Sequence, residues 1–334
     1  MSFRRILLIF TDKVRTANGS ASGKFTKSLP LIVLTSKIMN NYTIILAHGI
    51  ARFDFLLQQI SKDLGVLGLD HGLASDGLHY FKGIARHLRN HGFDVYQSSV
   101  GFASDVKNCA TDLKREVETA LAVRPEQLKV HIIAHSMGGL DARYMIVNYG
   151  MADKIASLTT IGTPHFGTSF ADWGMQHQGH EIIDVVSNVI DFGGFDDLTT
   201  SACKAFNASA QAAEATNDVF YQTYAANEDK KQIFAPLQPA WQIISDVEGE
   251  NDGLVSRTSQ RWESELTNGN GARKPVHQHD FPISADHLNE IGWWDINQLK
   301  LSDLFHANLL TTVKNYENSI KNVYLEIARG VQLL

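Results

Sequence analysis

Residues 128–139 read LKVHIIAHSMGG, and this stretch decides the fold of the chain. Its first seven positions are mostly apolar, as a strand buried on both faces requires. Ser136 follows at a sharp turn, and residues 138–149 have the character of a helix. A nucleophile held between a strand and a helix occupies a strained backbone position, and the residues two before and two after it must be small. Ala134 and Gly138 meet that requirement, so the sequence predicts a nucleophilic Ser136 at the end of a buried strand.

Short apolar runs alternate with longer amphipathic stretches on both sides of this segment. Residues 104–122 are the clearest helix, because their apolar positions recur at steps of three or four. The predicted strands are 43–47, 94–100, 128–134 and 154–161, and the predicted helices are 79–91, 104–122, 138–149 and 299–332. This alternation predicts an α/β fold with a mostly parallel central sheet covered by helices on both faces.

The regular alternation stops at Gly162 and resumes weakly near Trp241. We therefore expect one domain over residues 39–334, with an inserted region at about 166–240. Residues 1–38 are expected to lie outside the fold as an N-terminal extension, because much of this segment is polar and rich in Ser, Lys, Thr and Gly.

One stretch of the inserted region has the pattern of an amphipathic helix. Its apolar face is formed by Ile182, Val185, Val186, Val189 and Ile190. Charged and polar side chains occupy the opposite face. One interpretation is a helix packed into the core. The other is a mobile lid, whose apolar face covers the active site in water and turns toward lipid at an interface.

Composition excludes several classes of protein. The 334 residues are 44% hydrophobic and carry a net charge of -6, which argues against a nucleic-acid-binding protein with a concentrated basic face. The two cysteines, Cys109 and Cys203, cannot form a disulfide framework and are expected to be unpaired thiols. No apolar run approaches the roughly 18 residues of a transmembrane helix. Arg4 and Arg5 precede an apolar stretch that is too short for a signal peptide, so cytoplasmic residence and export by another route both stay open.

A serine hydroxyl needs a histidine that accepts its proton and a carboxylate that orients the histidine. In a fold with this serine turn, the acid and then the histidine follow in the chain. Asp252 is the preferred acid, because it lies in a turn after the strand-like residues 241–244. Its neighbours Asp246, Glu248 and Glu250 are the alternatives.

The preferred base is His287, which lies late in the chain after a loop that contains proline. His277 and His279 form a separate H-x-H pair with Asp280 beside them, a pattern that metal sites also use. No second cluster with suitable spacing accompanies this pair, so the sequence does not favour a zinc site there.

The attacking serine also requires two backbone N–H donors for the negative charge that develops on the substrate oxygen. The residue after the nucleophile, Met137, is expected to supply one. Ile50 is expected to supply the other, because His48-Gly49-Ile50 directly follows the first strand and Gly49 lets this loop approach the substrate.

With these residues in view, the chain resembles the bacterial family I triacylglycerol lipases. The likeness runs from about Tyr42 to Trp294. The motifs that carry it are HGI at 48–50, AHSMGG at 134–139, TTIGTPHFGTSFADW at 159–173, LTTSACKAFN at 198–207, ENDGLVS at 250–256 and DHLNEIG at 286–292.

This resemblance implies an α/β-hydrolase fold with Ser136 as nucleophile, Asp252 as acid and His287 as base. It also implies Ile50 and Met137 as the oxyanion donors. Members of that family hold a structural calcium ion through a carboxylate two residues after the catalytic histidine. Here that position is Asn289, a neutral ligand, with Glu290 beside it, so the resemblance implies calcium only weakly. The chemistry itself requires no cofactor.

The sequence therefore predicts a carboxylic ester hydrolase, and most specifically a triacylglycerol lipase that acts on lipid esters at a lipid–water interface. A soluble short-chain carboxylesterase or thioesterase with a static insertion is the first alternative. A non-catalytic binding protein with the same fold is the second, and the intact set of serine, acid and histidine argues against it.

Overall fold

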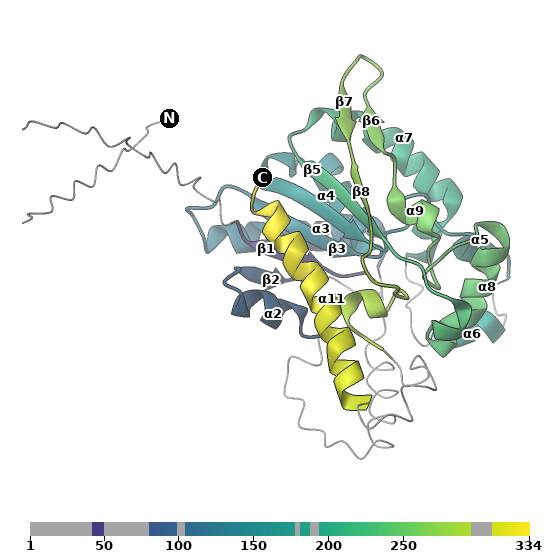
Figure 1. Cartoon of the computed structure of the whole chain (residues 1–334). Helices are drawn as coiled ribbons and strands as arrows, with labels where there is room; N and C mark the ends of the chain where they lie inside the picture. Colours follow the sequence, from purple (N-terminus) through teal and green to yellow (C-terminus); the bar gives the residue numbers. More distant parts are fainter. Residues whose placement is uncertain (1–41, 50–79, 99–103, 178–180, 188–193, 295–308) are drawn as a thin grey trace, which may run out of the picture. The chain divides into compact units, whose positions relative to one another are not determined.

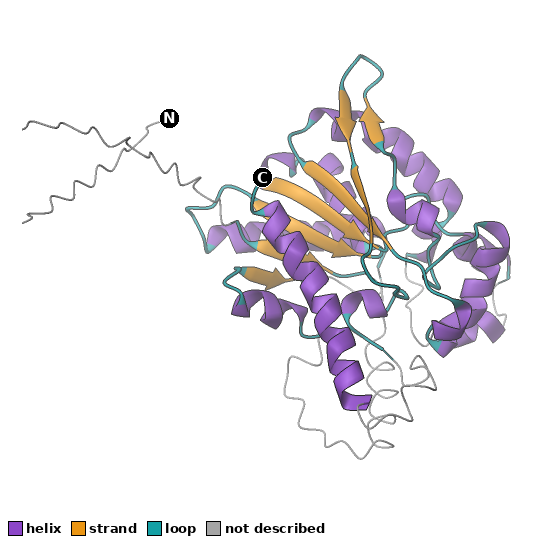
Figure 2. Ribbon diagram, in the orientation of Figure 1, coloured by secondary structure: helices purple, strands orange, loops and turns teal. Residues whose placement is uncertain are grey.

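The computed structural model describes residues 42–49, 80–98, 104–177, 181–187, 194–294 and 309–334. The chain divides into two compact units, Met1–Ile38 and Met39–Leu334, and all the described residues belong to the second. Within that unit a central sheet lies between helices (Figures 1 and 2). No helix in the described part of the chain is both long enough and apolar enough to cross a membrane.

The central sheet has six parallel strands in the order β2-β1-β3-β4-β5-β8. Its strands are β1 (Ile44–Ala47), β2 (Val95–Gln97), β3 (Val130–His135), β4 (Ile155–Ile161), β5 (Phe220–Ala225) and β8 (His277–Asp280). The chain runs from β1 to β2 in one direction and then returns past β1 to β3. In parallel sheets a crevice opens where the strand order reverses in this way, at the carboxyl ends of the strands. The topology therefore places a candidate site at the ends of β1 and β3.

The two faces of the sheet bury separate hydrophobic clusters. Ile44 and Leu46 of β1 belong to the first cluster, together with α2 (Ile84–Asn90) and α11 (Leu309–Val331). Ile45 and Ala47 point the other way, into a second cluster with α3 (Val106–Ala122) and α4 (Gly138–Asn148). Figure 1 shows α11 crossing one face of the sheet while α3 and α4 lie behind it. This confirms the predicted parallel sheet with helices on both faces.

Between β4 and residue 247, the described residues form the helices α5 (Ser169–Gln176), α6 (Glu181–Ser187), α7 (Thr200–Thr216) and α8 (Gln238–Val247). After them come α9 (Arg257–Arg261), the hairpin β6 (Glu265–Thr267) and β7 (Arg273–Pro275), and the short helix η6 (Asn289–Ile291).

Two secondary-structure expectations between residues 166 and 244 differ from the structure. Strand β5 lies inside the range 166–240 and pairs with β4 and β8, so this range is not a single insertion outside the sheet. The strand-like residues 241–244 instead belong to helix α8, in which Ala240 and Ile244, one turn apart, are both buried. Pro239 lies in the first turn of this helix, where proline is tolerated.

The other predicted elements agree with the structure apart from their ends. The helix predicted at 79–91 begins only at Ile84, after Gly83 with a φ of 67°. Helix α3 begins at Val106, and the Asp105 side chain caps it by accepting a hydrogen bond from Asn108 N–H. The start of the helix predicted at 299–332 lies outside the described residues, and its remainder is α11.

The candidate lid helix corresponds to α6. Val186 is completely buried and Ile182 is partly buried against the first cluster. Val189 and Ile190 lie outside the described residues, as does the side chain of Val185. Val186 therefore packs as the core interpretation expects, while movement of the helix stays a prediction.

Neither cysteine forms a disulfide, as predicted, and both are buried. Burial raises the pKa of both thiols, that of Cys203 to about 12. Neither cysteine therefore carries the thiolate that nucleophilic or redox chemistry needs near neutral pH.

Candidate active site

Ser136 directly follows β3 and has a φ of 56°, a left-handed backbone conformation that non-glycine residues rarely adopt. Its N–H donates to the Ile161 carbonyl at 2.9 Å, and the Thr163 hydroxyl donates to its carbonyl at 2.8 Å. These two bonds connect the turn to the end of β4, and they hold the serine in its strained position. The helix α4 begins two residues later, so the strand–turn–helix arrangement predicted for this segment is present.

Close backbone packing explains why glycines surround this turn. A Cβ atom added to Gly138 would lie 2.5 Å from the His48 carbonyl oxygen, and one added to Gly49 would lie 2.6 Å from the Ser136 Cβ. Both distances are shorter than any ordinary contact. The end of β1 therefore touches the serine turn through residues that have no side chain.

The structure brings the three predicted residues together. His287 Nε2 lies 2.8 Å from the Ser136 hydroxyl oxygen, and His287 Nδ1 lies 2.8 Å from Asp252 Oδ2. The His287 N–H also donates to the Asp252 carbonyl at 2.9 Å, so the main chains of the two loops are joined as well. All three side chains are buried. This geometry allows the imidazole to accept the serine proton while the carboxylate holds the other ring nitrogen.

The Asp252 carboxylate is fixed by its own loop. Its Oδ1 atom accepts hydrogen bonds from the N–H groups of Leu254 and Val255, both at 2.8 Å. Its Oδ2 atom accepts a third from Gln260 Nε2 at 3.0 Å, in addition to the contact with His287. These hydrogen bonds hold the Asp252 carboxylate in one orientation.

The three alternative acids have other partners. Glu248 accepts hydrogen bonds from Ser169 N–H and the Ser256 hydroxyl, and Glu250 forms an ion pair with Arg257. The Asp246 side chain accepts a hydrogen bond from Gln242, one turn earlier in α8. Of these four candidate acids, Asp252 alone is hydrogen-bonded to the His287 ring in the described part of the chain.

Of the two predicted oxyanion donors, Met137 lies among the described residues and Ile50 does not. Met137 is buried at the N-terminus of α4, and none of the hydrogen bonds among the described residues uses its N–H group. An unused N–H at the positive end of a helix is suited to a developing anion. Ile50 lies outside the described residues, although Gly49 before it touches the serine turn.

The arrangement of Asn289 and Glu290 does not fit a calcium ion. The Asn289 amide accepts from Asp286 N–H and donates to the Trp293 carbonyl at 2.8 Å. Glu290 Oε2 lies 2.9 Å from His135 Nε2. Calcium requires six to eight oxygen ligands directed at one point, whereas these two side chains are buried and turned toward groups of the protein.

Asp286 organises the turn that carries the histidine. Its Oδ1 atom accepts from the N–H groups of Leu288 and Asn289, and its Oδ2 atom accepts from Phe234 N–H. Burial raises the pKa of Asp286 to about 7, although these hydrogen bonds oppose the rise. By bonding the N–H groups of Leu288 and Asn289, the Asp286 side chain fixes the turn that carries His287.

His277 and His279 both lie on the edge strand β8 and pack against aromatic rings of β5. His277 stacks on Phe220 with ring centroids 4.6 Å apart, and His279 stacks on Tyr224 at 4.7 Å. Neither belongs to the one cluster of three metal-binding side chains found among the described residues. The H-x-H pattern is explained by packing on this edge.

Sequence reasoning missed several residues that surround the candidate site, and it named Glu290 only in connection with calcium. Gln260 reaches Asp252 from α9, and Tyr80, His135 and Glu290 form a buried polar group beside His287. His135 and Glu290 each lie within three positions of a predicted site residue, and this proximity was the available signal. Nothing local marked Tyr80 or Gln260.

The sheet order, the strained serine after β3 and the acid and histidine on later loops define the class of α/β-hydrolases. The family described as "Putative serine esterase (DUF676)" matches residues 88–234. Triacylglycerol lipase 2 of Saccharomyces cerevisiae is 30% identical over 258 residues, which cover 75% of this chain and 72% of the yeast protein. A triacylglycerol lipase of Vibrio cholerae is 26% identical over 316 residues, covering 85% of this chain and 89% of that protein.

Among solved structures, the mature lipase BlEst2 of Bacillus licheniformis aligns with a TM-score of 0.54 and 17% identity, covering 75% of this chain and 86% of that one. This likeness extends to the fold alone. The chain belongs to the family of lipases and serine esterases that includes the yeast lipase. It is a serine lipase or esterase, that is, a carboxylic ester hydrolase.

Proposed function

We propose that this chain is a triacylglycerol lipase that uses Ser136, His287 and Asp252 as a catalytic triad and forms an acyl-enzyme intermediate. One observation carries the proposal: the continuous hydrogen-bonded line from the Ser136 hydroxyl through both ring nitrogens of His287 to Asp252 Oδ2, with both contacts at 2.8 Å. Names of the relatives supply the substrate class, because both the yeast and the Vibrio proteins are named triacylglycerol lipases.

The reaction begins when Ser136 Oγ attacks the ester carbonyl carbon while His287 Nε2 accepts the hydroxyl proton. Asp252 stabilises the positive imidazolium through its bond to Nδ1. The former carbonyl oxygen, which now carries the negative charge, is placed to accept a hydrogen bond from Met137 N–H. Ile50 N–H is the second proposed donor. The ester C–O bond then breaks, and the alcohol leaves with the proton of His287. Water, deprotonated by His287, cleaves the acyl-enzyme and releases the fatty acid.

The test is Ser136→Ala, compared with Ser157→Ala as a matched control. Ser157 is also fully buried and also bonds to a histidine ring, His131 Nδ1, at 2.8 Å. Ser157 lies near the start of β4, whereas Ser136 follows the carboxyl end of β3. Ester turnover should fall to background in Ser136→Ala and stay close to wild type, per folded molecule, in Ser157→Ala.

A fluorophosphonate should label the wild type and the Ser157→Ala variant but not Ser136→Ala. Circular dichroism and thermal unfolding confirm that both variants are folded. Turnover at the native rate in Ser136→Ala, or labelling of a different serine, would remove Ser136 from this role.

A short-chain carboxylesterase or thioesterase is the second candidate, favoured by the complete burial of Val186 in the helix proposed as a lid. A lid that opens at lipid gives a jump in rate when a long-chain ester passes its solubility limit. We expect that jump for the lipase. A smooth rate curve across the limit, with the highest rates on butyrate esters, would favour the esterase with a static helix.

Assignment to bacterial family I lipases is the narrower part of the proposal. Support comes from the Vibrio lipase, which aligns over most of both chains. The yeast lipase lies outside bacteria and has the higher identity. The broader assignment to lipases and serine esterases does not depend on this branch.

A further inference from the structure

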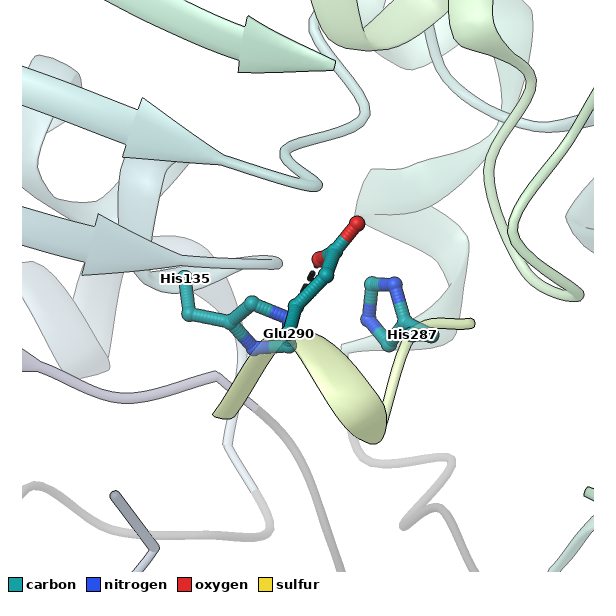
Figure 3. A group of neighbouring side chains, drawn as sticks. All are labelled: His135, His287 and Glu290. Carbon is teal, nitrogen blue, oxygen red and sulfur yellow. Dashed lines mark hydrogen bonds and ion pairs between the residues drawn. The ribbon is translucent and has the colours of Figure 1, made fainter. Parts of the chain in front are cut away.

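A second buried hydrogen-bonded chain runs beside the proposed triad. The Tyr80 hydroxyl oxygen lies 2.7 Å from His135 Nδ1, and His135 Nε2 lies 2.9 Å from Glu290 Oε2. His135 and His287 face each other with ring centroids 4.5 Å apart. Figure 3 shows the Glu290 carboxylate bonded to His135, with the His287 ring alongside. The proposed chemistry uses none of Tyr80, His135 and Glu290.

This chain joins the three segments that the site has to align. The loop of His48 and Gly49 that follows β1 (the oxyanion loop) contacts Tyr80, because the His48 and Tyr80 rings have centroids 5.3 Å apart. His135 directly precedes Ser136 in the serine turn. Glu290 lies three residues after His287, and the His287 ring lies beside the His135 ring with centroids 4.5 Å apart. Thus the oxyanion loop, the nucleophile turn and the histidine loop share one set of polar side chains.

Its members have almost no freedom to move. Glu290 and His135 are 0% exposed. A Cβ atom added to Gly162, whose φ is 58°, would lie 2.2 Å from Glu290 Oε2, so the carboxylate fills the space left by that glycine. The Tyr324 hydroxyl of α11 donates to the Glu290 carbonyl at 3.0 Å. Trp293 Nε1 donates to the Tyr80 carbonyl at 2.9 Å.

Burying a polar group of this kind in a core carries a free-energy cost. Burial raises the pKa of Glu290 well above its usual range and lowers the pKa of His135. Glu290 Oε1 is buried with no hydrogen-bond partner in the described part of the chain. Well-packed apolar side chains of similar volume are often at least as stabilising as a buried polar pair. Stability alone therefore does not account for polar residues here, whereas orientation does, because hydrogen bonds fix direction and apolar contacts do not.

We propose that Tyr80, His135 and Glu290 are positioning residues that hold the His287 ring in line with the Ser136 hydroxyl and fix the oxyanion loop against the same turn. The inference rests on the proposed triad. A metal ion is not needed to explain the cluster, although three ligand atoms of His135, His287 and Glu290 lie within 4.8 Å of one another. Both nitrogens of each ring are already engaged in hydrogen bonds.

Tyr80→Phe is the sharpest test, because it removes one hydroxyl that is hydrogen-bonded to His135, whose ring lies beside the His287 ring. Tyr221→Phe is the matched control. Tyr221 is equally buried and its hydroxyl accepts from Asn217, but it belongs to the cluster on the other face of the sheet. Both variants lose one buried hydroxyl, so their losses of stability should be similar.

Rates are measured per active site, after titration with a fluorophosphonate, on a soluble short-chain ester. We expect kcat of Tyr80→Phe to fall about tenfold, as when partners of site residues are removed elsewhere, with KM changed less than twofold. The labelling rate should fall by the same factor. Tyr221→Phe should keep the wild-type kcat. A purely structural role would reduce the titrated fraction of active protein and leave kcat per site unchanged, which would overturn the inference.

A double-mutant cycle with Glu290→Gln gives a second readout. If the three residues act as one chain, the kcat of the Tyr80→Phe/Glu290→Gln variant should be only slightly below that of the less active single variant. If the double variant instead loses kcat by the product of the two single fold-losses, the two residues act separately, which would contradict the proposal. The two hypotheses fail in different ways. No labelling of Ser136 in the wild type refutes the triad, whereas labelling at the native rate in Tyr80→Phe refutes only the positioning chain.

Discussion

Replacing Gly49 with alanine tests the closest approach in the site. The added Cβ would lie 2.6 Å from the Ser136 Cβ, 3.0 Å from the His135 carbonyl oxygen and 3.1 Å from Met137 N. Ordinary contacts begin near 3.4 Å. The end of β1 and the serine turn would therefore have to separate by about 1 Å, because backbone surrounds the new methyl group and no flexible side chain can make room.

A shift of that size reaches the reacting atoms directly. Misplacement of catalytic groups by about 1 Å lowers rates by about 100-fold, and overpacking of this kind lowers the free energy of unfolding by about 1–3 kcal/mol. We therefore expect kcat/KM of Gly49→Ala to fall about 100-fold while the protein stays folded at 25 °C.

Gly330→Ala is the control. Gly330 lies on α11, and an added Cβ meets nothing within 4 Å. It should keep full activity and gain up to about 1 kcal/mol from the helix preference of alanine. The assay is initial rate on a short-chain nitrophenyl ester, with urea unfolding for stability. A Gly49→Ala variant within twofold of the wild-type rate would refute the steric reasoning, since the two segments could then separate without consequence.

Three further predictions follow from buried polar groups. Arg143 and Glu214 form a two-point ion pair with both side chains fully buried, so Glu214→Gln should lower the free energy of unfolding by about 3–5 kcal/mol in urea titrations, and an unchanged value would contradict this. Burial lowers the pKa of His131 from 6.5 to about 4. As pH falls below 6.5, the His131 ring is therefore protonated in the unfolded chain before it is protonated in the folded chain. Stability should therefore drop by about 2 kcal/mol more between pH 7 and pH 5 in the wild type than in His131→Asn; equal slopes would show that His131 is not the source. Because Asn289 and Glu290 bond to protein groups, EDTA should leave the esterase rate unchanged, and a several-fold loss reversed by calcium would indicate a site built from other residues.

Local sequence signals were sufficient wherever one short segment carries the physical requirement. The apolar run that ends at Ala134, the serine, and the glycine at 138 each reflect constraints between near neighbours in the chain. The periodicity of 104–122 likewise follows from one helix burying one face. These elements were predicted with errors of a few residues at their ends, because capping and turn geometry decide where a helix stops.

The sequence-based prediction is wrong for segments whose secondary structure depends on distant partners. Strand β5 contains polar residues, and one of them, Gln222, is buried because its amide donates to Thr159 of the neighbouring strand. The stretch at 241–244 is short and apolar, and a pattern of that length fits a strand or a helix equally. Packing of one face of α8 against the core selects the helix.

The sequence by itself determined the fold class, the serine turn and the small set of acids and histidines from which a site could be built. Only the tertiary structure placed Asp252, the preferred acid, against the His287 ring and brought Tyr80 and Glu290 to His135. The physical reason is that hydrogen bonds between residues 35 to 155 positions apart leave no periodic or local trace in the chain. Such contacts exist only after the parallel strands have brought their carboxyl ends to one edge of the sheet.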